Sequence, residues 1–143
     1  MEIISHRGYW SKNSEKNKDI AFHRSFSLNF GTETDIRDFD GELVISHDVA
    51  NKNCITIEDF FEIYKSKDIQ SSLALNIKSD GLQDLLMKSL KKNNINNYFV
   101  FDMSIPDTII YLKKGINVFI RQSEYEVGTS FYDSASGIWL DAF

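Results

Sequence analysis

The chain has 143 residues, 26% of them charged, and a formal net charge of −5, which fits a single globular domain that can bury a core. This acidic balance gives no reason to expect a nucleic-acid partner or an anionic membrane surface, and no apolar run approaches the roughly 20 residues of a transmembrane segment. The single cysteine, Cys54, excludes an internal disulfide and, with no secretory signal pattern at the N-terminus, predicts a cytoplasmic protein.

Strands and helices alternate through the first third of the chain. An apolar segment at 2–5 predicts a buried strand ending at His6-Arg7-Gly8, and the polar stretch 11–18 predicts a loop. An apolar stripe at helical spacing follows and ends at Gly31; it comprises Ile20, Ala21, Phe22, Ser25, Phe26 and Leu28. Two strands are expected at 32–36 and 43–46, and the Asp40-Gly41 pair between them is typical of a β-hairpin.

The alternation continues to the end of the chain. Thr56 is the expected N-cap of a helix over 57–65. Further strands are expected in four apolar segments, at 72–77, 98–101, 118–120 and 138–140. Three helices are expected between them: one capped by Ser79 or Asp80 that runs to Leu90, one from Ser104 to Lys113, and a weak one around 130–134.

Alternating helices and short, continuously apolar strands indicate parallel strands covered by helices. The sequence contains about six βα units, whereas a closed (β/α)₈ barrel needs eight and typically about 250 residues. We therefore predict an α/β fold, an incomplete TIM-type barrel over 1–143 with a small β-hairpin after the second strand. Open barrel edges predict a homo-oligomer or aggregation, and a third possibility is that the chain is a fragment of a longer product.

Polar residues gather at the C-terminal ends of the predicted strands, the edge at which α/β barrels bind ligands. These residues are His6, Arg7, Glu33, Asp35, Asn76, Lys78, Asp102, Arg121 and Asp141. Glu33 and Asp35, two apart in a strand, face one side and offer oxygen ligands to a hard divalent cation. Arg7 and Lys78 suit phosphate oxygens, and His6 and His47 suit proton transfer. The combination predicts metal-assisted phosphoryl chemistry.

Each candidate residue also has a structural interpretation. His6 could be a histidine satisfied by the backbone, and His47 a plain polar residue at a strand end. Glu33 and Asp35 could form structural ion pairs with Arg7 and Arg37. Residues such as Asp102, Arg121 and Asp141 could simply solvate the barrel mouth, and Trp10 could either line the pocket or pack as a hydrophobic lid.

Several motifs together resemble the glycerophosphodiester phosphodiesterase family, part of a wider phosphatidylinositol-phospholipase-C-like superfamily of (β/α)₈ barrels. The motifs are His6-Arg7-Gly8, Asn17 ahead of Ala21-Phe22, the run GTETDI at 31–36, and Asp40-Gly41 leading to His47-Asp48. They cover roughly the first third of the chain, and the remainder is similar in its βα alternation.

The resemblance implies functional roles for these residues in cleaving a small-molecule phosphodiester. His6 and His47 would be the acid–base pair, and Glu33 and Asp35 would hold Ca²⁺ or Mg²⁺. Arg7 would contact the phosphate, and Lys78 and Trp10 are further expected substrate-binding residues.

The chain departs from the family pattern in two motifs, and the last two βα units of the family barrel have no counterpart in it. Asn76-Ile77-Lys78 stands where the family has Glu-x-Lys, so Asn76 would ligate the metal through a neutral carbonyl oxygen. Lys16-Asn17-Lys18 replaces a Glu-Asn-Thr loop. The leading hypothesis is a metal-dependent phosphodiester hydrolase; the alternative is a protein that keeps the fold and binds a phosphate ligand, or acts as a scaffold, without turnover.

Overall fold

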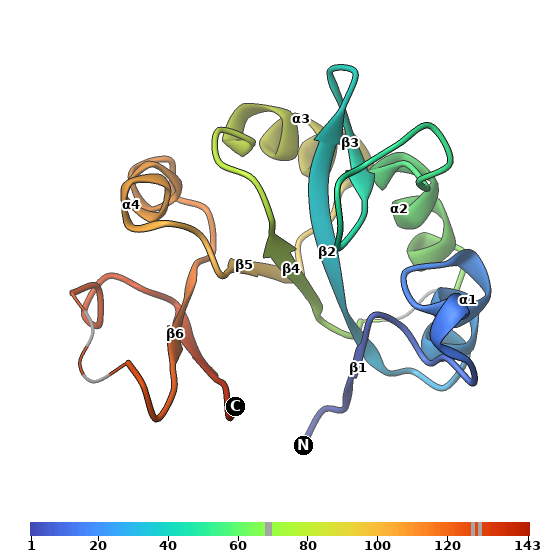
Figure 1. The fold of residues 1–143 in the computed structure, drawn as a ribbon, viewed down its shortest axis with the longest axis horizontal. Coiled ribbons are helices and arrows are strands. Elements are labelled where there is room, and N and C mark those ends of the chain that lie inside the picture. The colour runs from blue at the N-terminus through green and yellow to red at the C-terminus, as the bar shows by residue number, and fades with distance from the viewer. Residues whose placement is uncertain (68–69, 127, 129) are drawn as a thin grey trace.

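The computed structural model describes residues 1–67, 70–126, 128 and 130–143. Within them, four parallel strands form one sheet in the order β1 (Ile4–His6), β2 (Gly31–Phe39), β4 (Leu73–Ile77) and β5 (Tyr98–Phe101). Strand β3 (Glu42–Ile45) pairs antiparallel with the distal part of β2. Two more parallel strands, β6 (Phe119–Gln122) and β7 (Gly137–Leu140), pair with each other, and a bridge between Val100 and Val118 links them to β5. These strands follow one another along a curved, open sheet, as predicted for an incomplete α/β barrel (Figure 1).

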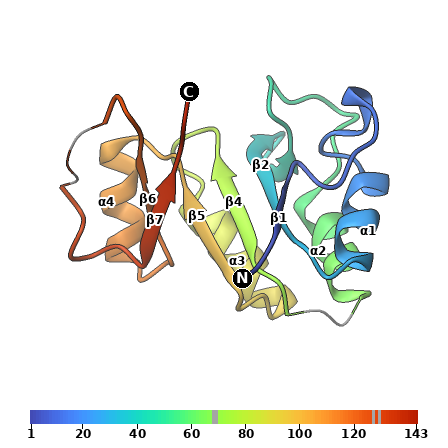
Figure 2. The same cartoon turned by 90° about the horizontal axis from the view of Figure 1, so that it is seen from below.

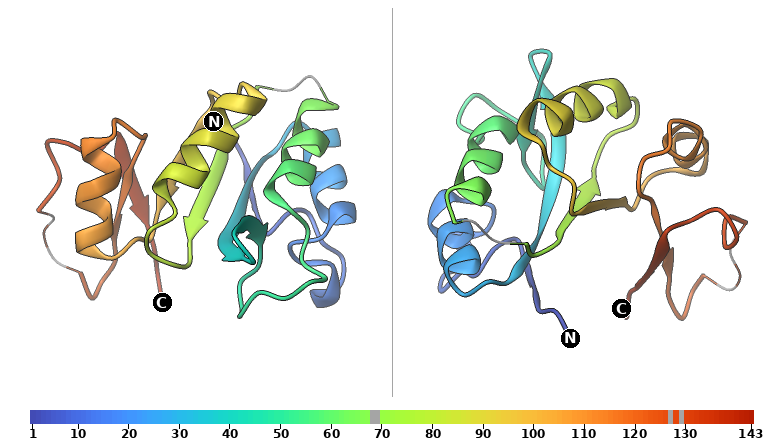
Figure 3. Two further views of the ribbon diagram at one scale, coloured as in Figure 1. Left: turned by 90° about the horizontal axis from the view of Figure 1, so that it is seen from above. Right: turned by 180° about the vertical axis from the view of Figure 1, so that it is seen from behind.

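Helices cover the outer, convex face of this sheet (Figures 2 and 3). The helices that the structure describes are α1 (Asp19–Ser27), α2 (Ile57–Lys65), α3 (Gln83–Asn93) and α4 (Ile105–Lys113), with a 3₁₀ helix, η1 (Asn13–Glu15), before α1. In the described part of the chain, no helix has the length and apolar character needed to cross a membrane.

Two helices begin where their capping residues predict. The Thr56 hydroxyl accepts a hydrogen bond from the Asp59 N–H at 3.1 Å, and α2 has the predicted bounds. The Ser104 hydroxyl accepts from the Asp107 N–H at 3.3 Å, with a proline in the first turn of α4. The β2–β3 hairpin is also confirmed: Asp40 (φ 51°) and Gly41 (φ 82°) form a two-residue loop between Phe39 and Glu42.

The two faces of the sheet carry different side chains because residues alternate along each strand. The main core lies between sheet and helices and includes Leu73 and Leu75 of β4. Ala74, Phe99 and Phe101 form a second cluster, on the other, inner face, and Trp139 packs against it. Trp139 stacks on Phe101 with ring centroids 4.2 Å apart. Strand register places the predicted acids on this inner face too, with Glu33 opposite Ala74 and Asp35 opposite Asn76.

Four local predictions are wrong. Ile20 (46% exposed) and Leu28 (52% exposed) lie outside the buried stripe of α1, which consists of Ala21, Phe22, Ser25 and Phe26. Leu28 follows the last helical residue, and the four buried positions leave Ile20 on the solvent side. Strand β2 extends three residues past Ile36 because the hairpin continues its pairing to Phe39.

The remaining two errors concern a helix start and a helix that does not form. Neither Ser79 nor Asp80 caps α3, because Gly81 (φ 85°) turns the chain and the helix starts only at Gln83. The Asp107 carboxylate of α4 instead accepts the Gly81 N–H at 3.0 Å. Residues 130–134 form turns and no helix, because the Phe131 carbonyl closes a single turn with Ala135 and β7 begins two residues later.

Candidate active site

The predicted site residues lie together where β1 and β4 end, and beside the part of β2 that pairs with them; β2 itself continues beyond Ile36 into the hairpin. Parallel pairing sets His6 opposite Glu33 and Asp35 opposite Asn76. Their side chains therefore form two adjacent layers on one face of the sheet. The His6 Nε2 lies 3.8 Å from a Glu33 carboxylate oxygen, so the two side chains share one site.

A sharp turn after β1 brings Arg7 over the sheet. Arg7 (φ 58°) and Gly8 (φ 80°) both have left-handed backbone conformations. A Cβ at position 8 would lie 2.7 Å from the Ala21 Cβ, so only glycine fits this approach to α1. The Arg7 N–H donates to the Glu33 carbonyl at 3.0 Å and to the Glu33 carboxylate at 3.1 Å. The turn thus fixes the Arg7 backbone on Glu33, and the guanidinium lies beside Asp35.

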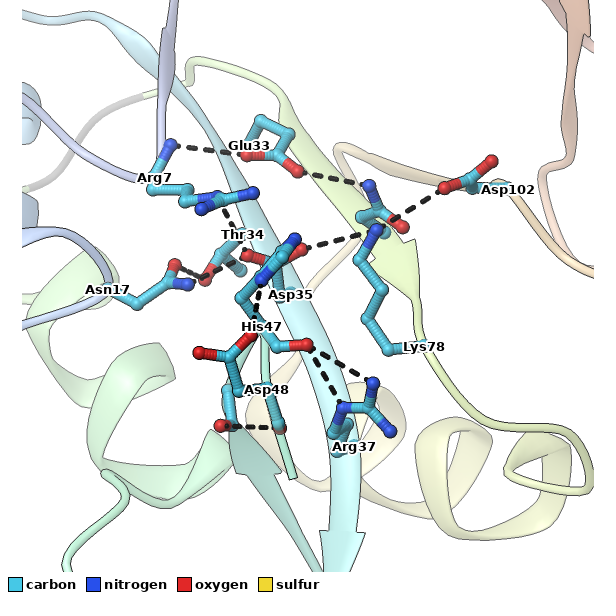
Figure 4. Close-up of polar contacts among 12 residues, drawn as sticks. Arg7, Asn17, Glu33, Thr34, Asp35, Arg37, His47, Asp48, Lys78 and Asp102 are labelled. Atoms are coloured by element: carbon cyan, nitrogen blue, oxygen red, sulfur yellow. Dashed lines mark hydrogen bonds and ion pairs between the residues drawn. The ribbon is translucent and has the colours of Figure 1, made fainter. Parts of the chain in front are cut away.

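Asp35 is the centre of the polar network (Figure 4). It is fully buried, and its carboxylate forms ion pairs with the Arg7 Nε at 3.1 Å and the Lys78 Nζ at 3.5 Å. The Asn17 side-chain amide donates to the same carboxylate at 2.8 Å, and its oxygen accepts from the Thr34 hydroxyl at 2.9 Å. Two cations and an amide therefore stabilise the charge of the buried Asp35 carboxylate.

Glu33 lies in a different environment although it is only two residues away. It is 2% exposed, and its carboxylate accepts hydrogen bonds from the Arg7 N–H and, at 3.3 Å, from the Asn76 amide. Burial, and then the negative charge of Asp35, raise the pKa of Glu33 to about 7. Partial burial, and then the Arg7 charge, lower the pKa of the neighbouring His6 below its ordinary value.

His47 lies in the segment that follows β3, the second strand of the hairpin. The Ser46 N–H donates to the Asp35 carbonyl at 2.9 Å, which returns the chain to β2. The Arg37 guanidinium donates to the His47 carbonyl at 3.1 and 3.3 Å instead of pairing with an acid, so that part of the structural interpretation is wrong. The His47 Nδ1 lies 2.8 Å from the Asp48 carboxylate, and His47 and Arg7 line the same pocket.

Lys78 connects the site to Asp102 and Arg121, for which the sequence left open a role in solvating the barrel mouth. Its Nζ lies 3.3 Å from Asp102, which also pairs with the Arg121 guanidinium. Asp102 (φ 71°) turns the chain after β5, and Arg121 binds Glu126 through both of its other guanidinium nitrogens. The only sequence signal for Asp102 and Arg121 is their position at strand ends, which they share with residues outside the site.

Trp10 supports His6 through the backbone. Its indole N–H donates to the His6 carbonyl at 2.9 Å, and the Lys16 ammonium lies 4.3 Å from its ring centroid. Trp10 therefore positions the β1 end; the predicted contact with substrate stays a prediction.

The oxygen atoms needed for a hard cation are present. Asp35 Oδ1 and Asn76 Oδ1 are buried and accept no hydrogen bond within the described residues, and Glu33 adds a carboxylate beside them. Such a donor set fits Ca²⁺ or Mg²⁺ by atom type. Its charge is low, because Asn76 is neutral and Arg7 and Lys78 already face Asp35. Among residues 1–67, 70–126, 128 and 130–143, no group of three or more His, Cys, Asp or Glu side chains is arranged to hold a metal.

Consecutive parallel strands, outer helices and polar residues at the C-terminal strand ends define an α/β barrel-type protein. More particularly, the fold is that of glycerophosphodiester phosphodiesterases. The chain aligns over 97% of its length with 74% of a Galdieria sulphuraria protein assigned to that group, with a TM-score of 0.78 and 15% identity.

Two further solved structures are similar. A glycerophosphodiester phosphodiesterase from Agrobacterium tumefaciens aligns with 98% of this chain over 76% of its own, with a TM-score of 0.74 and 14% identity. A phosphodiesterase from Oleispira antarctica, solved with its product sn-glycerol-3-phosphate, aligns with 98% of this chain over 74% of its own, with a TM-score of 0.74 and 13% identity. No family model matches the sequence, and no curated protein matches it. The structural likeness confirms the predicted fold and the family resemblance at the level of fold.

Proposed function

We propose that this protein hydrolyses small phosphodiesters, glycerophosphodiesters being the first class to test. One observation carries the proposal: two buried acids of β2 meet two cations and a histidine at the C-terminal ends of β1 and β4. The same fold occurs in solved glycerophosphodiester phosphodiesterases.

In this proposal, Arg7 and Lys78 bind the phosphate oxygens, because both already converge on one buried point. His6 acts as the base, since its lowered pKa keeps the imidazole neutral at physiological pH. His47, oriented by the Asp48 carboxylate, protonates the leaving alkoxide.

Glu33, Asp35 and Asn76 would hold the divalent cation, Ca²⁺ or Mg²⁺. When bound, the cation would supply positive charge that neutralises the phosphate oxygens as the P–O bond breaks. Its charge would also favour the ionised form of Glu33, whose pKa is about 7 in the protein alone.

The test is turnover of bis-p-nitrophenyl phosphate and glycerophosphocholine by the whole chain, with EDTA, Ca²⁺ or Mg²⁺. His6→Ala and Glu33→Gln should each lower kcat by about a hundredfold or more. His23→Ala is the matched control, because His23 is exposed on α1. Wild-type rates in both site variants would refute the proposal.

Asn76 favours a second candidate, a protein that binds a phosphate ligand without turnover. Asn76 brings no charge to the cation position and donates a hydrogen bond to Glu33. Isothermal titration with glycerophosphocholine separates the two candidates. Binding without product formation would support the second one, and no binding would exclude it.

A further inference from the structure

A second polar pocket lies directly beside the candidate active site. It has a volume of about 420 Å³ and lies between the η1 loop and the segment after β3. Arg7 and His47 form part of its wall, so it is continuous with the groups proposed to act on the phosphate. Its volume falls in the range of about 300–1,000 Å³ that is usual for small-molecule sites.

The pocket has an excess of positive charge. Lys16 and Lys18 line it, and within the described residues neither ammonium forms an ion pair. Asp48 is the acid in the lining, and its carboxylate is already paired with His47. An anion entering the pocket would therefore meet cations whose charge no carboxylate in contact compensates.

Lys16 is held in place for this role. Its ammonium lies 4.3 Å from the centroid of the Trp10 ring, and the residue is half-buried. A cation resting on an aromatic face loses less conformational freedom on binding an anion than a free surface lysine does. Its charge also reaches the candidate active site, because it contributes to the lowered pKa of His6.

The rest of the lining favours a hydroxylated ligand. Asn13, Asn51 and Asn53 line the pocket and are exposed, whereas the amide of Asn17, a further lining residue, is already bonded to Asp35 and Thr34. Amides hydrogen-bond sugar or polyol hydroxyls, and the lining contributes few apolar side chains for an acyl chain or choline group to contact. Side-chain amides that can bind a polyol therefore line the same cavity as Lys16 and Lys18, which form no ion pair with the described residues.

We propose that this pocket binds a second anionic group on the substrate, so that the substrate is a phosphodiester of a hydroxylated alcohol that carries another phosphate. This inference rests on the proposed phosphodiesterase function, which determines which of the two phosphates lies in the active site. The scissile phosphate lies at Arg7 and His6, and the second phosphate lies at Lys16, with Lys18 nearby.

The experiment compares glycerophosphoinositol with glycerophosphoinositol 4-phosphate, which differ by one phosphate. We expect the phosphorylated substrate to be favoured about tenfold in kcat/KM, mainly through KM, since one charge-assisted contact supplies that much. Lys16→Gln should abolish this preference. Lys12→Gln, the matched control, removes the same charge from an exposed lysine outside the pocket and should keep the preference.

Isothermal titration with the same two compounds distinguishes failure of this inference from failure of the proposed function. Tighter binding of the 4-phosphate that depends on Lys16, without turnover of either compound, would support the pocket and refute the hydrolase. Turnover or binding with equal preference for both compounds would overturn the inference. Lys16-dependent binding of inorganic phosphate with no discrimination between the diesters would assign the pocket to a free anion and also overturn it.

Discussion

Replacing Asp35 by asparagine removes the negative charge at the centre of the site with almost no change in shape. Asp35 is 0% exposed, whereas the side chains of its partners Arg7 and Lys78 are 20% and 18% exposed. The variant leaves two largely buried cations beside a neutral amide. We expect a large loss of stability, because an uncompensated buried charge is costly.

The distances from Asp35 to Arg7 and Lys78 determine how large the loss of stability should be. At 3.1 and 3.5 Å, each ion pair supplies a gross attraction of about 5 kcal/mol at an effective dielectric constant of about 20. Desolvation of the carboxylate opposes this sum by several kcal/mol. Removal of one partner from a buried pair typically costs about 3–5 kcal/mol, and the partial exposure of both cations places the expected loss near 3 kcal/mol.

Urea unfolding in EDTA measures the loss without interference from a bound cation. With a slope of about 2 kcal/mol per molar urea, the midpoint should fall by about 1.5 M. Asp84→Asn is the control, because Asp84 pairs with Lys114 at 2.7 Å while its side chain is 86% exposed, and its midpoint should hardly change. An Asp35→Asn protein as stable as the wild type would refute the reasoning and mean that the site carries a net excess of negative charge.

Three further predictions concern stability. Burial would raise the pKa of Glu58, but hydrogen bonds from Ser89, Asn93 and Lys92 lower it to about 2. The ionised Glu58 therefore stabilises the folded protein above pH 4.5, and this contribution is lost as the pH falls towards 2. Glu58→Gln should cost about 1 kcal/mol at pH 7, after allowance for solvent screening, and little at pH 2, in urea titrations at both pH values. Gly8→Ala should cost about 2 kcal/mol or more, because its Cβ would meet Ala21 at 2.7 Å and its φ is 80°; thermal unfolding measures this loss. Thr56→Ala should cost about 1 kcal/mol in the same measurement through loss of the α2 cap, whereas Thr56→Ser should retain the cap.

Each of these predictions has an outcome that contradicts it. A Glu58→Gln deficit that is equal at pH 7 and pH 2 would mean that the carboxylate charge does not stabilise the α2–α3 contact. Wild-type stability of Gly8→Ala would show that the turn after β1 can relax. Equal stability of the alanine and serine variants at position 56 would mean that the capping hydrogen bond does not stabilise α2.

Local chemistry was sufficient to predict several elements. The bounds of α2 follow from a threonine cap and an apolar stripe within one segment, and the Asp40-Gly41 loop follows from residues that tolerate positive φ. The start of α3 could not be found this way. Its first turn is anchored by Asp107, which lies 26 residues after Gly81 and belongs to another helix.

The candidate site was only partly predictable for the same reason. The two-residue spacing of Glu33 and Asp35 predicted that they share a face, and placement at a strand end identified Asn76 and Lys78. Their environments were not predictable: Asp35 is surrounded by cations, whereas burial raises the pKa of Glu33 to about 7. The link from Lys78 through Asp102 to Arg121 depends on three separate strands meeting at one edge.

The sequence by itself determined which side chains share a face and which end of each strand is polar, because alternation along a strand is a local property with a period of two. It also determined the register of the hairpin, where a two-residue loop sets the pairing of β2 with β3. Only the tertiary structure decided that His6 lies opposite Glu33 and Asp35 opposite Asn76. Parallel strands are joined by long crossovers, so their register depends on how the connecting helices pack on the sheet and not on the residues of any single turn.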